Sequence, residues 1–226
     1  MPQPLAMYWT MVLVDVANFT HPGRTRAHHA AVHDGLYKVL NKAFTEARID
    51  WAACHREDRG DGVMILVPAD VPAVVLADQL LERLVAALRE HNAIHVPEAS
   101  IRLRLVLHSG QVLLDEKGAV GPSLNFAFRL LAAPVAKKAL RESTGTLVVV
   151  TSDAFHDDVI LQEPVTAPKS YRRVHVEFDS FKSGAWLRLL GESPEVLDLF
   201  SDDELEQVRD WLSDVRVERF ADIARR

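Results

Sequence analysis

Residues 8–16 read YWTMVLVDV, an apolar run interrupted only by Thr10 and Asp15. The aromatic and β-branched residues in it are typical of a buried β-strand. Asp15 stands near the end of that strand, and a carboxylate beside a buried strand is costly to desolvate unless it has a partner. We therefore expect Asp15 to have a chemical role, and we look for its partners elsewhere in the chain.

Beyond this strand, apolar patterns alternate between further strands and helices. The other predicted strands cover residues 51–58, 63–67, 101–108 with a continuation over 111–114, 146–150, 172–178 and 185–190. The predicted helices cover residues 32–44, residues 71–91 after a cap at Asp70, and a segment that begins at Pro122 or Ser123 and ends near Pro134. This order predicts an α+β sandwich, with one mostly antiparallel sheet and helices packed on one face.

Charge and composition exclude several classes of function. The chain has 226 residues, and its 26 Lys and Arg against 32 Asp and Glu give a net charge of −6. This balance argues against binding to nucleic acid, although a local basic cleft could hold a small anion. The single cysteine, Cys54, excludes an internal disulfide and fits a reducing compartment. Without an apolar run of roughly 20 residues or a signal peptide, we expect a cytoplasmic protein that binds no membrane.

The chain is expected to have two parts, a main domain over residues 1–190 and an acidic extension over residues 191–226. The extension contains eleven acidic and five basic residues. Within it, the segment Ser201-Asp202-Asp203-Glu204 is a capping box, followed by a narrow apolar stripe. We predict a terminal helix there that docks on the domain or on a partner.

Two carboxylates point to metal chemistry. Asp15 ends the first strand, and Asp61 lies in the tight turn between the second and third strands. If these strands are neighbours in one sheet, both carboxylates converge at one end, where hard cations such as Mg²⁺ find oxygen ligands. Two metal ions on two carboxylates suit in-line displacement at phosphorus, and Gly60 and Gly62 allow the backbone to approach phosphates closely.

A second group of polar residues lies later in the chain. Asn125 and Arg129 are four residues apart in a predicted helix and therefore share a face. An asparagine can orient a sugar oxygen, and an arginine can neutralise charge on a transferring phosphoryl group. Lys182, in a predicted turn over residues 181–184, could reach a polyphosphate.

Each of these residues also has a plainer interpretation. Asp-Gly is a strong turn pair, so Asp61 alone would suit a simple hairpin. Lys182 alone would suit a solvated loop, and Glu57 with Arg59 would suit a surface ion pair of little energetic weight. The joint occurrence of the two aspartates, the asparagine and the arginine favours the functional interpretation.

Together these residues resemble the catalytic domain of class III nucleotidyl cyclases, the adenylate and guanylate cyclase family. Residues 14–20, 60–63, 105–112 and 121–130 resemble its motifs in order. The resemblance implies a ferredoxin-like cyclase sandwich over residues 1–190 that converts a nucleoside triphosphate into a 3′,5′-cyclic nucleotide and pyrophosphate. It also implies a homodimer in which Asp15, Val16 and Asp61 hold two Mg²⁺ or Mn²⁺ ions and face Asn125 and Arg129 of the opposite subunit. The nucleotide-binding residues that it implies are Phe19, Glu57, Arg59, Gly60, Gly118 and Lys182.

The resemblance leaves the base open. Glu57, four residues before Asp61, favours GTP, but Gly118 occupies the position where the family has a side chain that completes the adenine or guanine pair. Arg59 is also unusual, because that position is commonly apolar. A small cyclase without a sensor domain also resembles the pyrimidine cyclases of bacterial antiphage (Pycsar) systems, which make cyclic UMP or cyclic CMP for a downstream effector. We expect a pyrimidine cyclase in antiviral defence.

Three alternatives remain. One is a guanylate or adenylate cyclase, and another is a catalytically silent, cyclase-like module that binds nucleotides. A diguanylate-type synthase ranks last, because the chain has no run resembling Gly-Gly-Asp/Glu-Glu-Phe.

Overall fold

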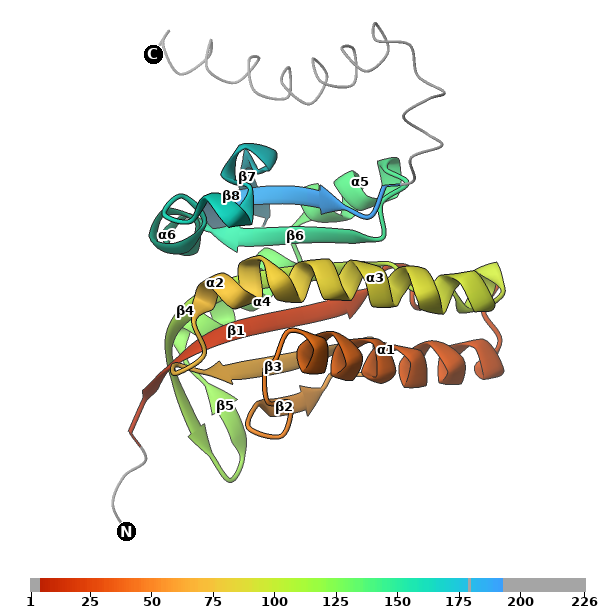
Figure 1. The fold of residues 1–226 in the computed structure, drawn as a ribbon, viewed down its shortest axis with the longest axis horizontal. Helices are drawn as coiled ribbons and strands as arrows, with labels where there is room; N and C mark the ends of the chain where they lie inside the picture. The colour runs from red at the N-terminus through yellow and green to blue at the C-terminus, as the bar shows by residue number, and fades with distance from the viewer. Residues whose placement is uncertain (1–4, 179, 193–226) are drawn as a thin grey trace, which may run out of the picture. The chain divides into compact units, whose positions relative to one another are not determined.

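The structure is a computed structural model that describes residues 5–178 and 180–192. Its strands form an eight-stranded sheet with the order β2-β3-β1-β4-β6-β8-β7, in which β5 pairs with β4 (Figure 1). All pairings are antiparallel except that of β4 with β6. The strands are β1 (Met7–Val16), β2 (His55–Asp58), β3 (Gly62–Pro68), β4 (Leu103–Asp115), β5 (Gly118–Val120), β6 (Leu147–Ser152), β7 (Arg172–Phe178) and β8 (Phe181–Leu190).

Helices connect these strands. They are α1 (Arg26–Glu46), α2 (Ala73–Ala77), α3 (Gln79–Ile94), α4 (Pro122–Leu131), α5 (Pro134–Glu142) and the single turn α6 (Asp153–Phe155). Among the residues that the structure describes, none of the helices has the length and apolarity that crossing a bilayer requires. The predicted helix at the acidic end of the chain lies outside the described residues.

The sheet is buried on both faces, which corrects the expectation of helices on one face only. Val12 and Val14 of β1 pack with α1 and α3, whereas Met11 and Leu13 pack with α4 and α5. Successive side chains of a strand point to opposite faces of the sheet. The apolar run of β1 therefore contributes side chains to the hydrophobic core on each face. The predicted α+β arrangement around a mostly antiparallel sheet is itself confirmed.

Three local predictions were wrong in detail. The second strand begins at His55, because the Asp50 side chain accepts a hydrogen bond from the Ala52 N–H (2.9 Å) and holds the preceding residues in a turn. The helix predicted over residues 71–91 breaks at Asp78 into α2 and α3. The segment 181–184, predicted as a turn, lies in β8.

Helices α1 and α3 lie side by side on one face (Figure 1), and His91 of α3 fills the contact between them. A Cβ built on Gly35 of α1 would lie 2.4 Å from the His91 ring, so only glycine permits this approach. The His91 Nε2 is 3.1 Å from the Ala99 carbonyl oxygen, and the ring stacks on His95. Burial lowers the pKa of His91, and the neighbouring His95 adds to this against the opposing Ala99 hydrogen bond.

This histidine makes the fold less stable in mild acid. Because the pKa of His91 is lower in the folded state than its ordinary value of 6.5, the unfolded chain binds the proton first as pH falls. We expect the free energy of unfolding to decrease from pH 7.5 to 5.5, and to decrease less in His91→Gln. Urea unfolding at several pH values measures this, with exposed His175→Gln as the control. Equal pH dependence in His91→Gln and the wild type would contradict the prediction.

Candidate active site

The structure brings Asp15 and Asp61 together at one end of the sheet. Asp15 pairs with Gly62 across β1 and β3, which places the turn containing Asp61 beside the end of β1. The N–H of Val16 donates to the Asp61 carbonyl oxygen at 2.7 Å and fixes the turn there. The Asp61 side chain is exposed, and its charge acts on the Asp15 carboxylate.

Arg104 is the direct partner of Asp15, and sequence reasoning missed it. Its Nη2 donates to Asp15 Oδ2 at 2.6 Å across β1 and β4, and both side chains are mostly buried, with 13% and 16% exposed. Burial raises the pKa of Asp15, Arg104 opposes this, and the charge of Asp61 adds to the rise. The period-two pattern of β4 marks Arg104 only as a polar residue. Its meeting with Asp15 depends on the strand order.

The acidic pair fits a divalent cation. Asp15 Oδ1 is buried and has no hydrogen-bond partner, so this oxygen is available to bind a cation. Within the described residues, no group of three or more His, Cys, Asp or Glu side chains is placed to hold a metal ion. Any further ligands would have to be backbone carbonyls such as that of Val16, water or phosphate oxygens, as Mg²⁺ commonly uses.

Asp58 braces the turn that carries Asp61. Its Oδ1 accepts from the Gly60 N–H at 2.6 Å, and its Oδ2 accepts from the Tyr37 hydroxyl at 2.7 Å and lies 2.7 Å from His33 Nε2. The Tyr37 hydrogen bond contributes most to lowering the pKa of Asp58. Burial, together with this carboxylate, raises the pKa of Tyr37 to about 12. Helix α1 therefore holds the turn in place.

The other residues of this region have partners of their own. Phe19, predicted to bind nucleotide, stacks on His29 with ring centroids 5.0 Å apart. His28 takes part in the N-terminal cap of α1 with Thr25. His29 contacts Phe19 and His33 lies against Asp58, so these two histidines are engaged separately.

Asn125 and Arg129 share an exposed face of α4, as the spacing predicts. The Arg129 guanidinium lies over the Phe181 ring at 5.2 Å, and Phe126 also packs against that ring. Lys182 follows in β8 and forms an ion pair with Glu177 of β7, with Nζ to Oε1 at 2.7 Å. Lys182 thus extends from a strand rather than a turn, next to the part of α4 that carries Arg129.

In one chain, α4 begins near Gly110 of β4, away from the β4 residue that faces Asp15, and its Phe128 lies beside Arg59 of the turn that carries Asp61. Arg104 is the β4 residue opposite Asp15, whereas a Cβ on Gly110 would lie 2.4 Å from Ser123 Oγ at the start of α4. The β4 segment between Arg104 and Gly110 spans about 20 Å.

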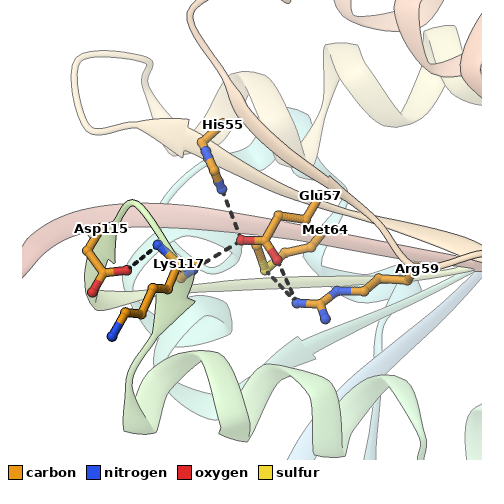
Figure 2. Close-up of polar contacts among 7 residues, drawn as sticks. His55, Glu57, Arg59, Met64, Asp115 and Lys117 are labelled. Carbon is orange, nitrogen blue, oxygen red and sulfur yellow. Dashed lines mark hydrogen bonds and ion pairs between the residues drawn. The ribbon is translucent and has the colours of Figure 1, made fainter.

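Glu57 holds the β4–β5 hairpin against β2 (Figure 2). Its Oε1 accepts from the Ala119 N–H at 3.0 Å and lies 3.1 Å from His55 Nε2, while its Oε2 accepts from Arg59 Nη2 at 2.9 Å. Burial alone would raise the pKa of Glu57, but these hydrogen bonds and the Arg59 charge outweigh it and lower the pKa. Glu57 and Arg59 form the predicted ion pair, but Glu57 is also tied to the hairpin.

The fold of this chain is similar to that of several solved structures. Guanylyl cyclase Cya2 matches with a TM-score of 0.57 at 16% identity, covering 85% of this chain and 96% of that one. An adenylate/guanylate cyclase/hydrolase from Silicibacter pomeroyi matches with 0.56 at 14%, covering 83% and 99%. The guanylate cyclase domain of RhGC from Catenaria anguillulae in complex with GTP matches with 0.52 at 16%, covering 82% and 97%.

These similarities establish the fold. No family model and no curated protein matches the sequence. The chain has the fold of class III adenylate and guanylate cyclase catalytic domains, which confirms the predicted resemblance at the level of structure.

The turn between β2 and β3 depends on Gly62. A Cβ at this position would lie 2.1 Å from the Val14 carbonyl oxygen and 3.0 Å from the Asp15 Cα, so β1 and β3 would have to separate. We expect Gly62→Ala to lower the free energy of unfolding by about 3 kcal/mol, since the backbone cannot yield as a flexible side chain does. Urea unfolding measures the change.

The matched control is Gly23→Ala, because the only atoms near its added methyl group belong to the His21 ring. We expect this substitution to change the free energy of unfolding by less than about 0.5 kcal/mol. Equal effects of the two substitutions would show that the approach of β3 to Asp15 is not as tight as described.

Proposed function

We propose that this chain is a nucleotidyl cyclase that converts a nucleoside triphosphate into a 3′,5′-cyclic nucleotide and pyrophosphate at the interface of a homodimer. The observation that carries the proposal is a carboxylate pair with an unpartnered buried oxygen at the end of β1, together with Asn125 and Arg129 on an exposed face of α4. In a head-to-tail pair of chains, the carboxylate pair of each copy would face Asn125 and Arg129 of the other copy. The dimer would therefore contain two equivalent sites.

The reaction joins and breaks bonds at one phosphorus. The ribose 3′-hydroxyl gives its proton to water, and its oxygen attacks the α-phosphorus of the same nucleotide. The bond to the β-phosphate oxygen breaks, and pyrophosphate leaves with the electron pair. Asp15, Asp61 and the Val16 backbone would hold two divalent ions, which would supply positive charge to stabilise the phosphoryl transfer.

The chain's own residues prepare this step. Arg104 holds Asp15 in position and favours its ionised form, since Asp15 is otherwise penalised by burial. Asp58 fixes the turn carrying Asp61 through the Gly60 N–H. From the second copy, Asn125 would orient the ribose, and Arg129 would neutralise charge on the phosphoryl group. Lys182 is exposed and could reach the triphosphate, and Phe19 and Gly60 would line its approach.

The finer proposal is a pyrimidine nucleotide, UTP or CTP, as substrate and a cytoplasmic signal in antiviral defence that acts through a cyclic-nucleotide-binding effector. It is supported by Glu57 and Gly118, which together do not complete the adenine or guanine pair implied by the family. A silent nucleotide-binding module is the alternative. Incubating the chain with each nucleoside triphosphate and Mn²⁺, and identifying products by mass, separates the two.

The shared site predicts complementation between inactive variants. Asp61→Ala removes an acidic ligand and Arg129→Ala removes the facing guanidinium, so each homodimer should lose activity by at least about 100-fold. A mixture of the two forms heterodimers with one intact site, and activity should return to about a quarter of the wild-type value. Product formation measured by chromatography, after subunit exchange, tests this.

The matched control mixes Asp61→Ala with Asp15→Ala, both from the acidic half. Their heterodimer contains no intact site, so activity should stay absent. Recovery in this control, or none in the first mixture when both variants remain folded dimers, would contradict the division of the site between chains.

A further inference from the structure

The Glu57 carboxylate has little capacity left for a ligand. Three of its roughly four acceptor positions are occupied by groups of the same chain, two of them on Oε1. The side chain is 23% exposed. Guanine presents N1–H and N2–H side by side, and pairing with both would require one acceptor on each carboxylate oxygen. Glu57 is therefore a brace between β2 and the hairpin, and it is not placed to accept both guanine donors.

Gly118 makes this brace possible. Its φ is +124°, and a Cβ built there would lie 3.1 Å from Glu57 Oε1. With no side chain at 118, the hairpin comes near enough for the Ala119 N–H to bind Glu57. The position that would otherwise carry a polar side chain toward a base thus contributes only backbone.

With Glu57 occupied and no side chain at Gly118, Arg59 is the polar group that remains available to a nucleotide base (Figure 2). Its Nη2 is bound to Glu57 Oε2 and lies 3.7 Å from Met64 Sδ, and its guanidinium lies 5.1 Å from the centre of the Phe128 ring. Its Nη1 and Nε atoms donate to no residue in the described part of the chain, and the side chain is 45% exposed. Phe128 belongs to α4, the helix that carries Asn125 and Arg129, so these donors lie beside that half of the proposed site.

We propose that Arg59, oriented by Glu57 and Phe128, selects the base by donating to carbonyl and ring-nitrogen acceptors, and that it selects a pyrimidine. This inference rests on the proposed cyclase function. Uracil offers two carbonyl oxygens, and cytosine offers N3 beside O2, both of which suit guanidinium donors. Adenine has no carbonyl oxygen. Guanine offers O6 and N7 to a guanidinium, but its paired N1–H and N2–H donors would lack the two acceptors they need.

The test compares kcat/KM for UTP, CTP, ATP and GTP with Mn²⁺ in the wild type and in Arg59→Met. The wild type should prefer UTP or CTP over both purines by at least about tenfold. Arg59→Met should lower kcat/KM for that pyrimidine by about 10- to 100-fold, the loss of one charge-assisted hydrogen bond, and change the purine values by less than about threefold. Binding of the four nucleotides with Ca²⁺, measured by calorimetry, should show the same order.

The matched control is Arg56→Met, a neighbouring arginine of β2 whose guanidinium lies over Trp51 instead. It should leave the base preference unchanged. A wild type that prefers a purine, or an Arg59→Met variant that lowers all four values equally, would overturn the proposal while the cyclase function stands. If no nucleotide is cyclised, the proposed function fails, and calorimetry still decides whether Arg59 discriminates between bases.

Discussion

The ion pair between Asp15 and Arg104 is the constraint on which the site depends. An apolar strand that ends in a carboxylate can be buried only if a positive charge meets that carboxylate, and the β1–β4 register supplies Arg104 directly opposite. A slip of one residue would turn Asp15 to the other face and leave both charges in apolar surroundings. The register that buries the core therefore also fixes the acidic end of the sheet.

That constraint extends to the neighbouring turn. Because β3 pairs with β1 through Gly62, the Asp61 turn must follow the position of Asp15, and the Val16 N–H and the Asp58 brace leave it little freedom. The acidic pair is thus organised before any ligand binds. Helix α4 is anchored separately through Phe126 and Phe181, on the face of the sheet to which Met11 and Leu13 of β1 point.

Much of the fold and of the candidate site can be predicted from local sequence patterns, whereas the remaining features depend on strand order. The apolar run of β1, the Asp61 turn and the helical spacing of Asn125 and Arg129 are local, so sequence predicts them. Arg104 could not be singled out, because its partner is 89 residues away and only the β1–β4 pairing joins them. The prediction of helices on one face was wrong, because an apolar run does not show whether helices cover one face of the sheet or both.

The glycine at position 118 restricts how this protein can evolve. Any side chain introduced there must adopt a backbone conformation that only glycine tolerates well, and it meets a carboxylate oxygen at 3.1 Å. A side chain at 118 would therefore strain the hairpin backbone and displace the Glu57 carboxylate, so a change at this one position also disturbs the contact between β2 and the hairpin.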